Sequence, residues 1–295
     1  MARVIIVTAA DAAYASLAEE LLASIAAAPE SRGIAIGFLD VGLEPAQRER
    51  IAATGATVVA PGWDYDFGKY PAKPPEHMRA LTARPHLRRY FPGYDLYLHM
   101  DADTWLQDWR TIELFVSAAE ERGFAIAPEL DRSYTPIVAG MFENDLKQRI
   151  YSRYFNEETT RKLAHFPLLN AGVFAASAGA PHWQAWHELL GRVYAEIGHL
   201  AAQEGFAVYY AEQFCLNAAV RSLPEPPALL PAWCNWMCHR ALPYCSEDGG
   251  VLYEPNPPYR KLGVIHLTSD TKNGVWELRD LAGKPHTRSL RYRRG

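Results

Sequence analysis

The stretch that decides the fold runs from Tyr94 to Trp105 and reads YDLYLHMDADTW. Its first half alternates in polarity and is rich in residues that favour strands, which predicts a buried strand. The carboxylates of Asp101 and Asp103 follow at the point where this strand should end. Side chains two residues apart in an extended chain point to the same side, so their oxygens can converge on one hard divalent cation. The stretch therefore predicts a strand with a ligand site at its carboxyl end.

A second interpretation of this Asp-Ala-Asp pattern stays open, because the pattern is short and common. In that interpretation Asp103 is the N-cap of a following helix and Asp101 is simply solvated. The apolar strand before the pair and the helical signals after it favour the metal site. Magnesium or manganese would then be held by one or two carboxylates, with substrate phosphates completing the coordination shell.

Strand and helix signals alternate along much of the remaining chain. Strands are predicted by the apolar runs at 4–7, 34–39, 57–59, 124–127 and 168–174. Repeated strand and helix units predict an α/β fold with a parallel sheet, whose ligands collect at the carboxyl ends of the strands. Asp11, in the loop after the first strand, would then share a rim of the sheet with Asp101.

The sequence lacks the glycine-rich loops that bind phosphates in other α/β proteins. G-x-G-x-x-G does not follow the first strand, and G-x-x-x-x-G-K-[ST] occurs nowhere in the chain. If the protein binds a nucleotide, a metal ion must therefore take over the role of such a loop.

Composition limits the class of protein. The chain has 295 residues, of which 49% are hydrophobic and 12% aromatic, so it can bury a large core. Its formal charge of -4 gives no general basic surface, which argues against nucleic acid as a partner. Four cysteines do not make a disulfide framework, and no basic and then apolar leader or run of 18 apolar residues occurs. We therefore expect a cytoplasmic protein.

Three further places carry candidate site residues. Glu212 and Gln213 are expected to open a helix, where they could contact a sugar or simply cap the helix. His266 lies in a predicted strand at 263–267 and could complete a metal site, although a histidine in a strand is more often a core residue. Lys272 could neutralise a phosphate. Gly172 inside a strand marks a close approach of backbone or ligand.

The cysteines suggest one further alternative, a zinc site. Cys234, Cys238, His239 and Cys245 lie close together in the sequence, but their spacing fits no standard zinc finger. We therefore do not predict zinc binding.

Taken together, these features resemble the retaining glycosyltransferases of family 8. The resemblance rests on motifs in the same order as in that family: Thr8-Ala9-Ala10-Asp11, Arg84 seventeen residues before Asp101, Asp101-Ala102-Asp103, Asn170-Ala171-Gly172-Val173, Glu212-Gln213-Phe214-Cys215-Leu216-Asn217, Leu230-Pro231 with Asn235, and His266 with Lys272. The chain departs from the family pattern by Glu212 in place of Asp, by Ser269 in place of Gly, and by Asn273-Gly274 in place of Pro-Trp.

The resemblance implies a GT-A-type fold, with a mixed, mostly parallel sheet flanked by helices, over residues 1–276. Residues 277–295 would form a basic C-terminal tail that either is solvated or contacts anionic lipid at the inner face of the membrane. The resemblance also implies roles for individual residues. The metal ligands would be Asp101, Asp103 and His266. The nucleotide sugar would be bound by Thr8, Ala9, Asp11, Arg84, Asp101, Ala102, Gly172 and Lys272. The groups near the reacting sugar carbon would be Gln213, Glu212 and Asn170.

The function that the resemblance implies is transfer of a hexose of the glucose or galactose type. The donor would be a UDP-sugar with Mn2+ or Mg2+, the acceptor a hydroxyl of a saccharide or lipid-linked acceptor such as a glycolipid, and the configuration would be retained. Two alternatives stay open. A sugar nucleotidyltransferase would normally show a glycine-rich basic loop after the first strand, which residues 8–14 lack. A non-catalytic protein that binds nucleotide sugars would share all the polar positions.

Overall fold

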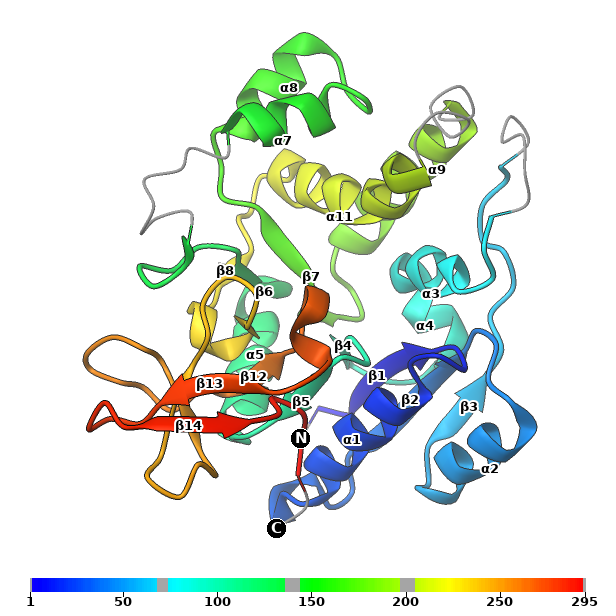
Figure 1. Ribbon diagram of the computed structural model, residues 1–295. Helices are drawn as coiled ribbons and strands as arrows, with labels where there is room; N and C mark the ends of the chain where they lie inside the picture. Colours follow the sequence, from blue (N-terminus) through cyan, green and yellow to red (C-terminus); the bar gives the residue numbers. More distant parts are fainter. Residues whose placement is uncertain (1, 68–73, 136–143, 197–204, 294–295) are drawn as a thin grey trace.

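The computed structural model describes residues 2–67, 74–135, 144–196 and 205–293 (Figure 1). Its centre is a seven-stranded sheet with the strand order β3-β2-β1-β4-β7-β6-β8. In that order the strands are β3 (Thr57–Val59), β2 (Ala35–Asp40), β1 (Val4–Ala10), β4 (Leu96–Met100), β7 (Leu169–Ser177), β6 (Phe124–Pro128) and β8 (Ala228–Leu229). The first four strands are parallel, β7 runs antiparallel to both of its neighbours, and β8 is parallel to β6. The prediction of a mixed, mostly parallel sheet is confirmed.

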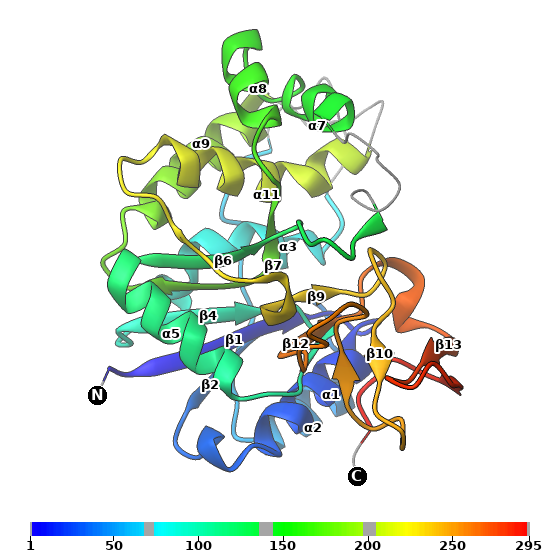
Figure 2. The ribbon, with the colours of Figure 1, turned by 90° about the vertical axis from the view of Figure 1, so that its left-hand side faces the viewer.

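Helices cover both faces of the sheet. The described helices are α1 (Ala15–Ala26), α2 (Pro45–Ala53), α3 (Met78–Ala83), α4 (Leu87–Tyr90), α5 (Arg110–Arg122), α7 (Asn144–Tyr151), α8 (Glu157–Ala164), α9 (His182–Glu196) and α11 (Gly205–Ser222). Of these, α7 and α8 pack on α11. Helices α1 and α5 bury apolar side chains against one face, and α3, α4, α9 and α11 bury theirs against the other. Figure 2 shows α9 and α11 above the strands, α5 in front of the strands, and α1 and α2 below the strands.

Strand β4 shows why the apolar run at 96–100 folds in this way. All five of its residues are buried. Leu96, Leu98 and Met100 point to the α1 and α5 face, while Tyr97 points to the face covered by α9. His99 stacks on the ring of Phe174, which belongs to that second face. Both faces are apolar because the strand is central, which explains a nearly continuous hydrophobic run.

A second, three-stranded sheet lies at the end of the main sheet toward which β1 runs (Figure 2). It consists of β5 (Thr104–Leu106), β12 (Val264–His266) and β9 (Trp236–Met237). Strand β12 pairs antiparallel with β5 and parallel with β9. The remaining short elements are η1 (Pro29–Ser31), η2 (Arg84–His86), η3 (Ala232–Cys234), η4 (Ser269–Lys272), β10 (Tyr244–Cys245) and β11 (Leu252–Tyr253).

The residues predicted to form a basic tail are packed onto the protein as far as they are described. They contribute an antiparallel hairpin of β13 (Trp276–Arg279) and β14 (Pro285–Arg288). Leu290 is fully buried, and its carbonyl accepts a hydrogen bond of 2.9 Å from the indole of Trp105. Arg291 forms an ion pair of 2.6 Å with Glu20 in α1. Within the described ranges, no helix has both the length and the apolar character needed to cross a membrane.

Candidate active site

The topology brings chemically active side chains to one edge of the main sheet. Asp11 follows β1, and Asp101 follows β4, the parallel neighbour of β1. Because parallel neighbours end at the same edge, the two carboxylates share that edge. Glu129 follows β6, which runs in the same direction as β4 because both are antiparallel to β7.

Asp101, Asp103 and His266 form a compact group of potential metal ligands. One ligand atom from each lies within 4.8 Å of the other two. The pairing of β5 with β12 is the cause, since it places His266 opposite Thr104, the residue after Asp103. The two carboxylates suit manganese or magnesium, and the imidazole can complete the site for a transition metal such as manganese.

A chain of hydrogen bonds fixes the tautomer of His266. The backbone N–H of Gly172 donates to Oδ1 of Asn170, so the amide oxygen of Asn170 faces inward as an acceptor. The side-chain amide nitrogen of Asn235 donates to the same oxygen at 2.9 Å. The side-chain oxygen of Asn235 therefore faces His266, and it lies 3.0 Å from Nδ1 of that ring. Nδ1 must donate that bond. In the neutral imidazole the free lone pair is then on Nε2, 3.4 Å from a carboxylate oxygen of Asp103. Nε2 of His266 and the carboxylate oxygen of Asp103 are then both lone-pair donors, and their short separation is what binding to the same cation requires.

Gly172 makes room for this group. A Cβ atom at this position would lie 2.4 Å from a ring carbon of His266, 2.8 Å from Oδ1 of Asn170 and 2.9 Å from Oδ2 of Asp101. The backbone carbonyl of Gly172 also accepts a 2.7 Å hydrogen bond from the N–H of Asp101. The glycine therefore lets strand β7 pass directly beneath the potential ligands.

Arg84 is shared between two carboxylates. Its Nη2 contacts Asp101, and its Nη1 donates to Oε2 of Glu212 at 3.0 Å. Burial alone would raise the pKa of Asp101, but the guanidinium of Arg84 and the ring of His99 hold that pKa well below its ordinary value. One positive charge cannot balance both anions, and Glu212 is left with the weaker share. Burial raises the pKa of Glu212 to about 7, and Arg84 only partly opposes this increase.

We expect Glu212→Gln to stabilise the protein at alkaline pH. The pKa of Glu212 rises from its ordinary 4.5 to about 7 on folding, so the folded state resists ionisation. The free energy of unfolding therefore falls as the pH rises from 4.5 through 7. The total loss is about 3 kcal/mol once Glu212 is ionised in both the folded and the unfolded state. Gln keeps an acceptor for Arg84 without that cost. Urea unfolding at pH 5 and pH 8 should show the variant gaining about 2 kcal/mol more at pH 8, whereas an equal difference at both pH values would contradict a buried, titrating carboxyl.

Glu212 and Gln213 lie in the middle of a helix. The prediction that they open a helix is wrong, because α11 already begins at Gly205. The buried residues Ala211 and Cys215 on either side of them pack into the core between α11 and the sheet. The two polar side chains therefore act from the helix wall, and the interpretation of helix capping does not apply.

Glu129 joins several of these groups and was not anticipated from the sequence. Its Oε1 accepts hydrogen bonds from the amides of Asn170 at 2.9 Å and Gln213 at 3.2 Å. Its Oε2 accepts from Arg240 at 2.9 Å. The Oε1 of Gln213 in turn accepts from the N–H of Ala171 at 3.1 Å. The available signal was its position directly after an apolar strand, the same position that Asp101 occupies.

Lys272 reaches the metal-ligand group from the C-terminal part of the chain. Its ammonium lies 2.9 Å from Oδ2 of Asp103 and 3.1 Å from the hydroxyl of Tyr14. Burial alone would lower the pKa of Lys272, but the carboxylate of Asp103 raises it. The residue therefore remains positively charged beside the group.

The remaining predicted binding residues lie around the first strand. Thr8 and Ala9 are in β1, and Thr8 is buried with a hydroxyl that has no hydrogen-bond partner within the described ranges. Asp11 accepts a 3.0 Å hydrogen bond from the N–H of Tyr14. Ala102 is buried among apolar residues that include members of α1. Its side chain is therefore a packing group, and only its backbone could contact a ligand.

Two alternatives from the sequence are not supported. Asp103 leads directly into β5, and the next helix begins at Arg110 with Trp109 as its N-cap residue, so Asp103 caps no helix. The thiols of Cys234, Cys238 and Cys245 are buried and free, and burial raises the pKa of Cys234 to about 12. Among the described residues, the group of side chains close enough to share a metal ion consists of Asp101, Asp103 and His266 and contains no cysteine.

Comparison with known proteins finds similarity at the level of structure. No protein-family model matches the chain, and no curated protein sequence matches it. The galactosyltransferase LgtC, in complex with donor and acceptor sugar analogues, superposes with a TM-score of 0.54 and 18% identity over 90% of this chain and 88% of its own. Mouse xyloside xylosyltransferase 1 superposes with a TM-score of 0.53 and 13% identity, and the match covers 92% of this chain and 99% of its own. The bifunctional glycosyltransferase WbbM superposes with a TM-score of 0.55 and 13% identity, and the match covers 91% of this chain and 46% of its own. The chain therefore has the GT-A fold of these glycosyltransferases.

Proposed function

We propose that this protein is a metal-dependent, retaining glycosyltransferase. It moves a hexose of the glucose or galactose type from a UDP-sugar to a hydroxyl group of a saccharide or lipid-linked acceptor. The single observation that carries the proposal is the convergence of Asp101, Asp103 and His266 to within 4.8 Å at the carboxyl edge of the sheet. In an α/β sheet this edge is where ligands bind.

The residues present fit a divalent cation. Asp101, Asp103 and the Nε2 atom of His266 would hold Mn2+ or Mg2+, and the bound ion supplies positive charge that neutralises a diphosphate leaving group. Lys272 provides a second positive charge at the same place, since it lies 2.9 Å from Asp103. Arg84, which is held by Asp101 and Glu212, keeps the aspartate ionised and oriented.

The side chains near the expected sugar position favour direct displacement by the acceptor. Glu129 is bound to Asn170, Gln213 and Arg240. Glu212 binds Arg84 through Oε2, and its other oxygen, which has no hydrogen-bond partner within the described ranges, is buried and not presented to an incoming sugar. Gln213 is held at both ends of its amide but keeps an unused oxygen lone pair. This lone pair can stabilise positive charge on a sugar carbon as the leaving group departs.

A product assay separates this proposal from its alternatives. The purified protein is incubated with manganese and a panel of nucleotide sugars, with and without a chelator, and released nucleotides are identified. We expect UDP from UDP-glucose or UDP-galactose, dependent on the metal. Release of UMP would instead indicate pyrophosphate chemistry of the nucleotidyltransferase kind. Binding of a nucleotide sugar without any release, in the presence of varied acceptors, would favour a non-catalytic binding protein.

Lys272→Met should weaken donor binding without unfolding the protein. The change removes the charge beside Asp103 at nearly constant bulk. A charge-assisted contact with a diphosphate contributes about 1.5 to 3 kcal/mol, so the dissociation constant for UDP should rise by about tenfold to a hundredfold. Calorimetric titration with UDP and manganese measures this.

The matched control for this change is Lys284→Met, because Lys284 is exposed in the loop between β13 and β14. The control should bind UDP like the wild type. Equal UDP affinity for Lys272→Met and the wild type would make Lys272 a surface residue without a role in binding.

A further inference from the structure

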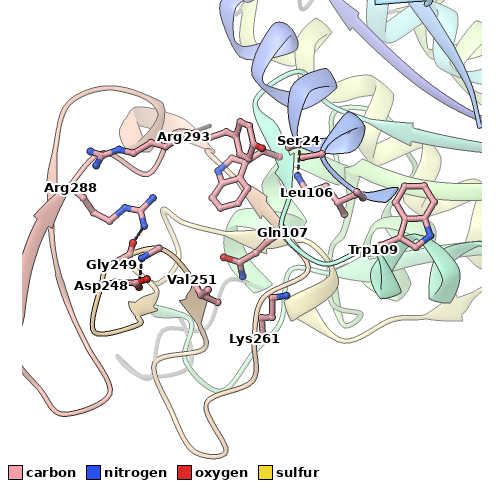
Figure 3. A pocket seen from close by; sticks show the side chains of 15 residues that line it. Ser24, Leu106, Gln107, Trp109, Asp248, Gly249, Val251, Lys261, Arg288 and Arg293 are labelled. Carbon is pink, nitrogen blue, oxygen red and sulfur yellow. Dashed lines mark hydrogen bonds between the residues drawn. The ribbon is translucent and has the colours of Figure 1, made fainter. Parts of the chain in front are cut away.

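A pocket lies apart from the candidate active site. It has a volume of about 560 Å³ and is bounded by the end of α1, by β5 and the turn after it, by residues 248–251 and by the C-terminal segment (Figure 3). Leu106 and Gln107 line it, at the end of β5 remote from Asp103. None of the potential metal ligands lines this pocket. Its volume is in the range of sites that hold a small molecule.

Aromatic rings form part of the wall. Trp105, Trp109 and Tyr292 all line the pocket. The rings of Trp105 and Tyr292 lie 5.6 Å apart between centroids, and the indole N–H of Trp105 donates to the carbonyl of Leu290. These contacts hold the rings in place before any ligand arrives. Rigid aromatic faces suit the flat apolar face of a ring-shaped ligand.

Positive charge dominates the polar part of the wall. Arg288, Arg293 and Lys261 line the pocket together with one acidic residue, Asp248. Lys261 already has an anionic partner, since its ammonium lies 3.4 Å from Asp108. Asp248 offsets part of the remaining charge, so the wall keeps a net positive charge that comes from the two arginines, which Figure 3 shows on the side of the pocket opposite Trp109.

Arg288 carries its charge in a buried position, and Asp248 acts on it only from beyond ion-pair distance. Its residue surface is only 7% exposed, and its guanidinium donates to the carbonyls of Gly249 and Ser289. Among the described residues, no carboxylate lies within 4 Å of Arg288 or Arg293. Burial lowers the pKa of Arg288, the nearby positive charge of Arg293 lowers it further, and Asp248 opposes this decrease only in part. A buried cation beside a second cation is stabilised when an anion binds between them.

We propose that this pocket binds an anionic saccharide, meaning a sugar that carries a carboxylate or a phosphate group. The anionic group would contact Arg288 and Arg293, and the sugar ring would pack on the aromatic wall. The choice of a saccharide among small anions rests on the proposed glycosyltransferase function. The pocket would then hold part of a charged acceptor away from the reacting hydroxyl.

The test measures binding by calorimetry on the full chain, without donor and without turnover. The probes are digalacturonic acid and glucose 6-phosphate, with galactobiose and glucose as their neutral counterparts. We expect at least one charged probe to bind, with an affinity at least about tenfold above that of its neutral counterpart, because paired guanidiniums recognise the anion. The charged probe that binds identifies whether carboxylate or phosphate is preferred.

Variants locate the binding. Arg293→Gln removes an exposed charge from the pocket and should weaken binding by about tenfold, as should Trp109→Leu. Arg291→Gln is the matched control, because Arg291 is bound to Glu20 and Ser16 and does not line the pocket. Melting temperatures confirm that each variant is folded, and Tyr292→Leu replaces Trp109→Leu if the latter unfolds.

Three results would overturn the inference: no binding of either charged probe, equal binding of charged and neutral probes, or binding that Arg293→Gln and the folded aromatic variant leave unchanged. Because the test measures only binding, a protein without transferase activity can still support the inference that this pocket binds an anionic saccharide. Conversely, an active transferase that binds neither charged probe would contradict only the second site.

Discussion

Asp103→Asn should nearly abolish sugar transfer while the fold survives. The substitution keeps the shape of the side chain but removes an anionic oxygen from the group formed with Asp101 and His266. Loss of one such electrostatic contact costs about 3 to 4 kcal/mol of transition-state stabilisation, which is a factor of several hundred in rate. The variant also loses its ion pair with Lys272, so its response to manganese should weaken as well. Turnover, manganese dependence and melting temperature are measured on the same protein sample.

The matched control is Asp95→Asn, just before the amino end of β4, where Asp95 contacts the exposed Arg3. This change should leave turnover within about twofold of the wild type, because exposed ion pairs contribute little. A fully active Asp103→Asn protein that manganese still stimulates would end the metal assignment. The glycosyltransferase proposal would lose its central support with it.

Gly172→Ala should reduce transfer by at least about a hundredfold, although it adds a single methyl group. The new Cβ atom would lie 2.4 Å from a ring carbon of His266 and 2.9 Å from a carboxylate oxygen of Asp101. Neither neighbour can stay in place, so the potential ligands must separate. A misplacement of about 1 Å in a reacting group can cost about a hundredfold in rate. Overpacking of this buried strand should also lower stability by about 1 to 3 kcal/mol.

Gly179→Ala provides the comparison for this variant. Gly179 follows the same strand β7, its φ is not positive, and a Cβ atom there would meet nothing within 4 Å. It should therefore fold, bind manganese and turn over as the wild type does. Calorimetric titration with manganese and a turnover assay on both alanine variants test the difference. If Gly172→Ala binds manganese with unchanged affinity, the close packing of Gly172 against the ligands has no functional consequence.

The sequence determined the strand that carries the acidic pair. The run Leu96 to Met100 is apolar apart from His99, and all five of its residues are buried, as is typical of a central strand of an α/β sheet. The carboxylates of Asp101 and Asp103 then follow at its carboxyl end, where ligands collect in such sheets. The order of the motifs from Thr8 to Lys272 supplied the expected GT-A fold, and the structural similarity confirms that fold.

The local sequence pattern did not predict the extent or the role of an element when contacts with other elements decide them. Helix α11 reaches back to Gly205, so Glu212 and Gln213 line its middle. Residues 277–295 read as a basic tail because of their arginines, and the structure describes them as far as residue 293. In the structure, Leu290 is buried against Trp105, and Arg291 pairs with Glu20. Such contacts depend on segments far away in the sequence, which periodicity does not report.

Only the tertiary structure assembled the site. His266 lies on a strand of three residues, and its distance from Asp103 depends on the pairing of that strand with β5. The sharing of Arg84 between Asp101 and Glu212 likewise needs three separate segments to meet. Periodicity shows which face of an element is buried, but it does not show which elements lie side by side. Polar groups that compete for one partner acquire their charges and orientations only after that packing is complete.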